Sequence, residues 1–545
     1  MNTNRKYLIG LDFGTLSVRA LLMDAASGEE IAVSEFVYPH AVMDHTLPSG
    51  KRLPLRYALQ HPQDYIDGLQ ITVREVLEKS QIDPQDVAGL CVDFTTCTVV
   101  PINENGTPLC MLDGYADEPH AYVKLWKHHA ALDYAEEINR KAEARGERWL
   151  SVYGGKVSCE WLLPKIVEVL REAPEIYDAT ARFAEAGDWI SFLLTGEHTT
   201  GAGFAGLKAL WTADGGFPSN DFYTAIDPRL DGIVGTKICN DVRASGSCVG
   251  RLSEEGARLI GLPKGTPLAT PLVDGCTPLP ALAATNEGEM TLIVGTSGVA
   301  LVLAKEKRDI PGLCGYVKDS VIPDYYAYES GQASVGDTFS WFVHNCVPRA
   351  YEEEAAACGM NIHSYLRKKA SVLRVGESRL VALDWFNGNR SVLKDDSLSG
   401  VLLGLTLKTR PEEIYRALIE ASAFGVRMIV EMFESHGIKI DRICAAGGIA
   451  QKDPMMMQIY ADILQKELRV AGSAQSAARG SAIYAAAASG LFSDMPSAVA
   501  HFALPDKAHY SPIAENVEAY NRLYDEYVRL HDYFGRGCND VMKRI

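Results

Sequence analysis

Apolar runs near the start of the chain alternate with short polar breaks, a pattern that predicts strands joined by turns. The runs at residues 7–12, 18–24 and 31–38 indicate a three-stranded meander, with a turn containing Ala-Ser-Gly-Glu before the last strand. The irregular stretch at residues 39–62 is rich in proline, histidine and polar residues. A loop of this length in a compact domain is usually functional or disordered. Apolar residues at helical spacing over residues 63–80 then predict a helix.

The next segments mix strands and helices. A buried strand is predicted at residues 87–92, helices over most of residues 118–175 with a glycine break at 154–155, and a helix at residues 188–194. The polar residues at positions 93–98 come directly after the first of these strands. In α/β proteins this is where ligands bind, so we expect functional side chains there.

The second half of the chain repeats this alternation. Strands are predicted at residues 290–304, 325–329 and 442–446, and helices at 333–346, 349–357, 410–436, 454–464, 476–489 and 514–536. Alternating strands and helices with glycines at the strand ends predict the α/β class. The 545 residues are too many for one core. We therefore expect two domains, residues 1–273 and residues 274–545.

A strand–turn–strand pattern occurs twice, at residues 9–23 and at residues 292–301. Each copy has an apolar run, then Gly-Thr with small polar neighbours, then a second apolar run. Glycine lets backbone N–H groups approach an anion closely, and the hydroxyl groups add further donors. The pair therefore predicts two similar lobes that bind one polyphosphate. Two unrelated β-hairpins are the alternative interpretation.

Three other positions are candidates for chemistry. Asp12 stands at a strand end beside Gly-Thr, where a carboxylate can hold Mg²⁺ or simply stabilise the turn. The pair Gly447-Gly448 leaves room for a flat or anionic ligand at a helix N-terminus, although a tight turn would also explain it. Asp274 lies near the domain junction and is a candidate base for a phosphoryl acceptor, with a structural Asp-Gly turn as the alternative.

Composition excludes several classes of function. Lysine and arginine number 53 and aspartate and glutamate 70, which gives a net charge of −17. This balance argues against general binding to nucleic acid or to an anionic membrane. The chain has no P-loop motif, which argues against a P-loop NTPase. Its 12 cysteines include no C-x-x-C pair, and we expect them to be reduced thiols. Neither the N-terminus nor the alanine-rich run at residues 481–491 resembles a signal peptide or a membrane span, so we expect a cytoplasmic protein.

Taken together, the motifs resemble those of the FGGY carbohydrate kinases. The resemblance runs from about residue 6 to residue 500 and includes motifs that are specific to the family. Residues 7–19 and 292–301 resemble the two phosphate motifs of the family, and residues 443–464 resemble its adenosine motif. Residues 153–165 resemble its signature segment, and the match continues at residues 384–391 and 400–405.

The resemblance implies two actin-like (ribonuclease H-like) domains flanking a deep catalytic cleft, with the sugar mainly on the first domain and ATP mainly on the second. It implies that Asp274 is the general base and that Asp12 and Asp274 are associated with Mg²⁺. The implied sugar contacts are Thr96, Lys208, Asp274 and Glu329. The implied ATP contacts are Gly14, Thr15, Gly295, Thr296, Ser297, Gly447, Gly448 and Gln451. Without the resemblance, nothing ranks Lys208 and Glu329 above other charged residues.

One departure from the wider family bears on the substrate. Residues 93–98 read Asp-Phe-Thr-Thr-Cys-Thr, where many members carry a Gly-Gln-Met type sequence. This departure and the long loop favour the branch that transfers the γ-phosphoryl of ATP to the 5-hydroxyl of L-ribulose, with D-ribulose as a second candidate, in L-arabinose catabolism. A xylulokinase or another sugar or polyol kinase is the alternative, and a non-kinase actin-like ATPase is the competing class. The oligomeric state is not fixed, and a homodimer is one candidate.

Overall fold

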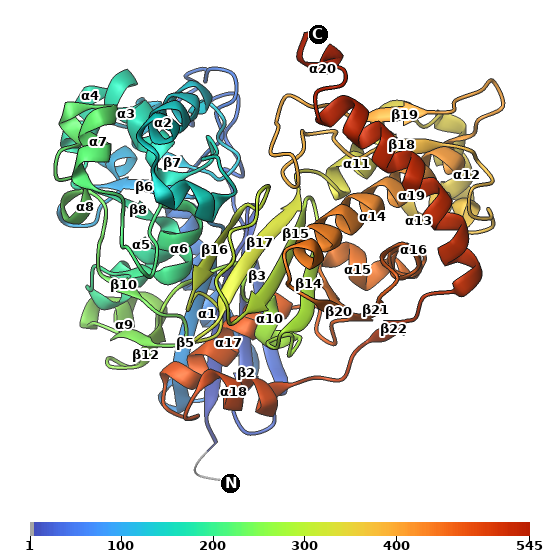
Figure 1. Ribbon diagram of the computed structural model, residues 1–545. Coiled ribbons are helices and arrows are strands. Elements are labelled where there is room, and N and C mark those ends of the chain that lie inside the picture. Colours follow the sequence, from blue (N-terminus) through green and yellow to red (C-terminus); the bar gives the residue numbers. More distant parts are fainter. Residues whose placement is uncertain (1–4, 545) are drawn as a thin grey trace. The chain divides into compact units, whose positions relative to one another are not determined.

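The computed structural model describes residues 5–544, and its contacts divide the chain into two compact units (Figure 1). Unit 1 contains the chain up to Thr285 together with Gly315–Ala327 and Gln475–Leu504. Unit 2 contains Asn286–Cys314, Tyr328–Ala474 and the chain from Pro505. Both units combine sheets with helices, so the predicted α/β class is confirmed. The domain boundary near residue 273 stays a prediction.

The main sheet of unit 1 has the strand order β11-β12-β5-β1-β2-β3, and β13 also pairs with β5. Its strands are β1 (Tyr7–Phe13), β2 (Ser17–Asp24), β3 (Glu30–Val37), β5 (Val87–Phe94), β11 (Cys248–Arg251), β12 (Pro267–Ala269) and β13 (Leu272–Val273). The predicted meander is confirmed, because β1, β2 and β3 pair in antiparallel fashion. Strand β5 pairs in parallel with β1, β12 and β13, so the carboxyl ends of β1, β5 and β13 meet at one edge.

Two helices from distant parts of the chain cover this sheet. Helix α1 (Pro62–Ser80) packs on β2 and β3, and α17 (Ser476–Ala488) packs on β1 and β5. The ring of Phe13 contacts Tyr65 of α1, whereas Gly10 faces the backbone of α17. Side chains three positions apart on a strand point to opposite faces. The two helices therefore bury opposite faces of the sheet.

The rest of unit 1 surrounds a smaller sheet with the order β4-β7-β6-β8. The remaining elements are β4 (Leu59–Gln60), β6 (Val99–Ile102), β7 (Val123–Lys124), β8 (Arg182–Glu185), β9 (Thr200–Gly201), β10 (Val242–Arg243), β16 (Gly315–Lys318), α2 (Leu132–Arg145), α3 (Leu162–Glu172), α4 (Pro174–Ala179), α5 (Ala186–Thr195), α6 (Ala202–Lys208), α7 (Asn220–Ile226), α8 (Ile233–Thr236), α9 (Glu254–Ile260), α10 (Pro278–Ala281) and α18 (Met495–Phe502). The helix expected across residues 118–131 is wrong, because β7 lies there and pairs with β4 and β6.

The main sheet of unit 2 contains the strand order β17-β15-β14-β20-β21-β22. The elements are β14 (Gly288–Val294), β15 (Gly298–Ala304), β17 (Tyr326–Gln332), β18 (Val381–Leu383), β19 (Val401–Leu403), β20 (Ile440–Ala446), β21 (Glu467–Val470), β22 (Ala508–Tyr510), α11 (Gly336–Cys346), α12 (Arg349–Ala357), α13 (Ile362–Ala370), α14 (Pro411–Ser435), α15 (Gly448–Lys452), α16 (Pro454–Leu464), α19 (Ala514–Gly535) and α20 (Val541–Arg544). The predicted hairpin and the predicted helices of this half are confirmed. The elements that were not predicted are α13, α15, α20, β18, β19, β21 and β22. Strand β20 pairs in parallel with β14.

Two further findings bear on the expectations from composition. The cysteines of the described chain are free thiols, as predicted. Among residues 5–544, no helix is both long enough and apolar enough to cross a bilayer.

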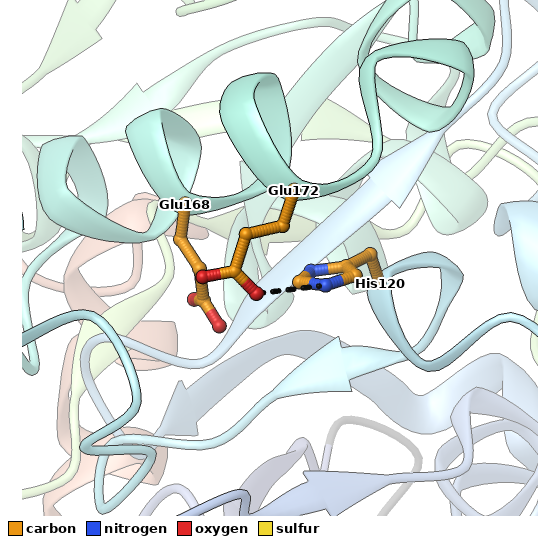
Figure 2. A group of neighbouring side chains, drawn as sticks. All are labelled: His120, Glu168 and Glu172. Atoms are coloured by element: carbon orange, nitrogen blue, oxygen red, sulfur yellow. Dashed lines mark ion pairs between the residues drawn. The ribbon is translucent and has the colours of Figure 1, made fainter. Parts of the chain in front are cut away.

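Helix α3 carries acidic side chains into the smaller sheet of unit 1 (Figure 2). The fully buried Glu168 lies 3.2 Å from Lys124 Nζ and accepts a hydrogen bond from His128 Nε2 at 2.9 Å. One turn later, Glu172 Oε2 lies 3.4 Å from His120 Nε2. A buried carboxylate needs such partners, because an isolated charge would lose its hydration without compensation. The cluster therefore fixes α3 against the segment that contains β7.

The same cluster offers the donor set of a divalent cation, from His120, Glu168 and Glu172. However, Lys124 Nζ lies 3.2 Å from Glu168 and 3.2 Å from His120 Nδ1. The lysine ammonium group thus supplies the positive charge that these donors would otherwise share with a metal ion. We interpret the cluster as a structural ion-pair network.

The buried histidines predict how the stability of unit 1 depends on pH. Burial, reinforced by the charge of Lys124, lowers the pKa of both His120 and His128 from 6.5 to about 3. The unfolded chain therefore takes up protons between pH 6.5 and 3 while these folded side chains stay neutral, so stability is lost as the pH falls through this range. We expect His128→Gln to flatten the decline in melting temperature between pH 6.5 and about pH 4, because glutamine does not titrate.

The control for this measurement is His45→Gln, since the His45 side chain is 92% exposed. It should leave the slope of melting temperature against pH unchanged. Equal slopes for the His128→Gln variant and the unaltered protein would contradict the interpretation.

The close packing of α17 on β1 gives a second prediction. A Cβ atom at Gly10 would lie 1.8 Å from the carbonyl oxygen of Ala478, which is backbone and cannot rotate away. Gly10→Ala should therefore lower the free energy of unfolding of unit 1 by about 3 kcal/mol or more, because overpacking forces the helix off the sheet. Thermal melting measures this loss. Gly215→Ala, in an exposed turn where the nearest atom belongs to the side chain of Thr212, should change the melting temperature little.

Candidate functional site

Three aspartates come together at the carboxyl edge of the unit 1 sheet. In the parallel register Asp12 pairs with Asp93, and Leu272 pairs with Asp93 from the other side. Two residues after Leu272, the backbone N–H of Asp274 donates to Phe94 O at 2.9 Å. Asp12 and Asp274 were singled out from the sequence, and the register places Asp93 between their strands. This arrangement concentrates negative charge at one point of the edge.

Burial and mutual repulsion dominate the electrostatics of the carboxylates at this edge. Burial raises the pKa of Asp93 well above its usual range, and the neighbouring Asp12 and Asp274 raise it further. Burial also raises the pKa of Asp12, although the Arg19 guanidinium at 3.5 Å opposes the shift. Asp93 Oδ2 accepts a hydrogen bond from Ser481 Oγ at 2.5 Å, while Oδ1 is buried with no hydrogen-bond partner among the described residues.

These residues suit a magnesium ion. Mg²⁺ prefers a few carboxylate oxygens and completes its shell with water and phosphate oxygens. A cation near Asp12 and Asp274 would offset the repulsion between negative charges that contributes to the raised pKa of Asp93. Functional side chains were expected among residues 93–98 from their position after a buried strand, but Asp93 itself was given no specific role.

The first Gly-Thr turn is held by side chains from other loops. Gly14 N–H donates to Ser17 O at 2.9 Å, which closes the turn between β1 and β2. Thr15 O accepts from Gln60 Nε2 at 2.7 Å, and Thr15 Oγ1 accepts from the indole N–H of Trp126 at 3.1 Å. Because the threonine oxygen accepts from the indole, its own hydroxyl proton can point toward an anion. Gln60 and Trp126 were not predicted, since no local pattern marks them.

The predicted sugar contacts in unit 1 lie on the loop after β5 and at the end of α6. Thr96 is half-buried, and its neighbour Cys97 adopts a left-handed backbone conformation with φ of 59°. Lys208 is buried, with its Nζ 5.5 Å from the centre of the Trp161 ring. Burial raises the pKa of the Cys97 thiol, and the charge of Lys208 partly opposes this rise, as expected if its ammonium group lies near the loop.

In unit 2, the second Gly-Thr turn is attached to the start of α11. Gly295 N–H donates to Ser297 O at 3.1 Å within the turn. Thr296 O then accepts from Val335 N–H at 2.9 Å, and Gly295 O accepts from Gly336 N–H at 3.0 Å. The conformation of the predicted phosphate turn is therefore fixed by the helix that follows β17.

The predicted adenosine turn lies beside this hairpin. In the parallel register Ile293 pairs with Ala446, so the end of β14 and the glycine pair after β20 meet at one edge of the sheet. Gly447 has a φ of 97°, and a Cβ atom there would lie 2.5 Å from a Val294 backbone oxygen. A Cβ on Gly448 would meet no atom within 4 Å. The first glycine is required for packing, and the second leaves open space.

The two remaining predicted residues also belong to unit 2. The side chain of Gln451 donates to Ala471 O at 2.7 Å and accepts from Lys507 Nζ at 2.9 Å. It thus holds a neighbouring loop, and a nucleotide contact from Gln451 stays a prediction. Glu329 lies half-buried on β17, and its backbone oxygen accepts from Cys314 N–H at 3.0 Å. Thr96, Lys208 and Asp274 belong to unit 1, so the full set of sugar contacts stays a prediction as well.

Comparison with known proteins identifies the family of the chain. The family model for the N-terminal domain of the FGGY family of carbohydrate kinases matches residues 7–279, and the model for the C-terminal domain matches residues 290–489. A ribulokinase from Bacillus licheniformis is 48% identical over 535 residues, which is 97% of each chain. A ribulokinase from Mycolicibacterium smegmatis is 45% identical and covers 99% of this chain and 96% of its own.

Solved structures share the fold at lower identity. A xylulose kinase from Rhodospirillum rubrum has a TM-score of 0.78 at 24% identity, covering 96% of this chain and 98% of its own. A gluconate kinase from Lactobacillus acidophilus has a TM-score of 0.79 at 18% identity, covering 98% and 99%. With both family domains matched and the fold shared along nearly the whole chain, this protein belongs to the FGGY family of carbohydrate kinases.

Proposed function

We propose that this protein is an ATP-dependent ribulokinase, which transfers the γ-phosphoryl group of ATP to the 5-hydroxyl of L-ribulose and forms ribulose 5-phosphate in L-arabinose catabolism. The observation that carries the proposal is the identity of 45% to 48% with ribulokinases over nearly the full length of both chains. The xylulose kinase that shares the fold is only 24% identical. D-Ribulose, the mirror image of L-ribulose, is a second substrate candidate, because it carries the same keto and hydroxyl groups along the same carbon chain.

In the proposed reaction, unit 1 binds the sugar and provides the base. Asp274 accepts the proton of the attacking hydroxyl as the new P–O bond forms. Its Oδ1 accepts a hydrogen bond from Gly275 N–H at 2.7 Å, which orients the carboxylate. Thr96 and Lys208 orient the open-chain ketose by hydrogen bonds, and Glu329 of unit 2 is proposed to complete this set.

Charge stabilisation is the main catalytic requirement of phosphoryl transfer. Asp12 and Asp274 would hold Mg²⁺, which neutralises charge on the phosphate oxygens when it is bound. The turns at Gly14-Thr15 and at residues 295–297 supply N–H and hydroxyl donors to the phosphates. Gly447 and Gly448 leave space for the adenosine. The support for this assignment is that the two predicted nucleotide motifs of unit 2 meet at one sheet edge.

We also propose a cytoplasmic location and a homodimer as the assembly. The free cysteines support a reducing compartment. Sedimentation velocity measures the assembly directly.

Replacing the proposed base tests the mechanism. Asp274→Asn should lower turnover by about 10²- to 10⁴-fold, because the hydroxyl proton loses its acceptor. ATP binding, measured by calorimetry, should be retained. Asp231→Asn is a matched control, since Asp231 also precedes a glycine in unit 1 but is exposed. Near-normal turnover of the Asp274→Asn variant would show that another group is the base.

A panel of sugars tests the function itself. We expect ADP release to depend on a ketopentose, with L-ribulose giving the largest kcat/KM and D-xylulose and glycerol much smaller values. A coupled assay of ADP release measures this dependence. A preference for D-xylulose would favour the xylulokinase alternative, and sugar-independent ATP hydrolysis would favour an actin-like ATPase.

A further inference from the structure

The signature segment at residues 153–165 ends at a lysine that has no part in the reaction described above. Lys165 lies on α3 and is fully buried. Its ammonium group donates to the backbone oxygen of Cys97 at 2.5 Å, to that of Leu125 at 2.8 Å and, over a longer 3.5 Å, to that of Lys124. A buried ammonium is costly unless its protons are all bound. The hydrogen bonds of Lys165 offset this cost, and the shortest of them goes to the loop that contains Cys97.

That loop follows β5 and carries Thr96. It is held from two sides, since Lys165 binds Cys97 O and the carboxylate of Glu185 accepts from Thr98 N–H at 3.2 Å. The hydroxyls of Thr95 and Thr98 lie 2.7 Å apart and close the loop on itself. Lysine and glutamate thus bind the carbonyl and the N–H of one peptide group, the one that joins Cys97 to Thr98.

The backbone of this loop needs support. Cys97 has a φ of 59°, in the left-handed region that disfavours residues with a side chain. Such a conformation persists only when the surroundings determine it. The hydrogen bond from Lys165 to Cys97 O restrains the residue with this conformation, directly after Thr96.

The second carbonyl that Lys165 binds has independent support. Leu125 N–H donates to Ala58 O at 3.0 Å, and Lys124 beside it is paired with Glu168 at 3.2 Å. Loss of the Lys165 ammonium would therefore disturb the Cys97 loop more than the segment around Leu125.

We propose that Lys165 is a positioning residue for sugar binding, which acts through the Cys97 carbonyl to hold the loop 95–98 so that Thr96 faces the sugar. The inference rests on the proposed function, in which Thr96 contacts the ketose. It assigns a role to the last residue of the signature segment.

Steady-state kinetics of Lys165→Met test this role. Methionine keeps the length of the side chain and removes the ammonium group. The KM for L-ribulose should rise about three- to tenfold, the loss expected for one weakened hydrogen bond to substrate. The KM for ATP should be unchanged, which a general loss of folded structure would not produce. Equal increases in both KM values, or an unchanged sugar KM, would overturn the proposal.

The matched control is Lys124→Met, which removes another buried lysine that contacts the same segment of the chain. This variant should lower the melting temperature, because it leaves Glu168 without its ammonium partner, but it should not raise the sugar KM. An equal increase in sugar KM for both lysine variants would show that burial of charge, rather than the loop contact, is responsible.

A double-mutant cycle with Thr96→Ala shows whether Lys165 acts through Thr96. Once Thr96 is alanine, Lys165→Met should add little to the sugar KM, because the side chain being positioned is absent. Additive effects would overturn the proposal, and so would a Thr96→Ala variant with an unchanged sugar KM. Failure of the unaltered protein to phosphorylate any ketopentose would instead refute the proposed function.

If Lys165→Met does not give a folded protein by circular dichroism, Lys165→Arg replaces it. Arginine keeps the buried charge but adds atoms, which displaces the Cys97 carbonyl. The same selective increase in sugar KM is expected, and an unchanged value would again overturn the proposal.

Discussion

Parallel pairing of strands is the constraint on which both halves of the candidate site depend. In unit 1 a hairpin strand, β1, pairs in parallel with β5, and in unit 2 the hairpin strand β14 pairs in parallel with β20. Parallel strands end at the same edge of a sheet, so groups that follow different strands meet there. In unit 1 this edge collects aspartates, and in unit 2 it joins the second Gly-Thr turn to the glycine pair.

Buried charge is the second recurring feature of unit 1. At the sheet edge, burial raises the pKa of Asp93, and the negative charges of the neighbouring Asp12 and Asp274 raise it further. The carboxylate of Glu168 is in the opposite situation, because Lys124 and His128 surround it and hold its pKa below the usual range despite burial. Repulsion between carboxylates thus persists at the proposed magnesium site, whereas the carboxylate of the structural cluster is paired with a positive charge within the protein.

Local periodicity was enough to predict most of the fold. The two hairpins, the helices α1, α14 and α19 and the glycine turn at Gly447 follow from spacing of apolar residues and from glycine at strand ends. Partners across long sequence separations could not be predicted. Nothing local indicates that Ser481 donates to Asp93, or that the side chain of Gln451 is bound to Ala471 and Lys507. The same holds for Lys165, whose contacts are backbone oxygens that carry no sequence signal.

The return of α17 to the first sheet has a consequence for how the chain is made. Domains generally fold as units while the chain leaves the ribosome, N-terminal domain first. Here the face of β1 that contains Gly10 is covered by the helix at Ser476–Ala488, which is synthesised late. This face of the sheet therefore stays exposed until α17 has been synthesised and can pack on it. Unit 1, although it begins the chain, can be completed only after most of unit 2, up to Ala474, has been translated.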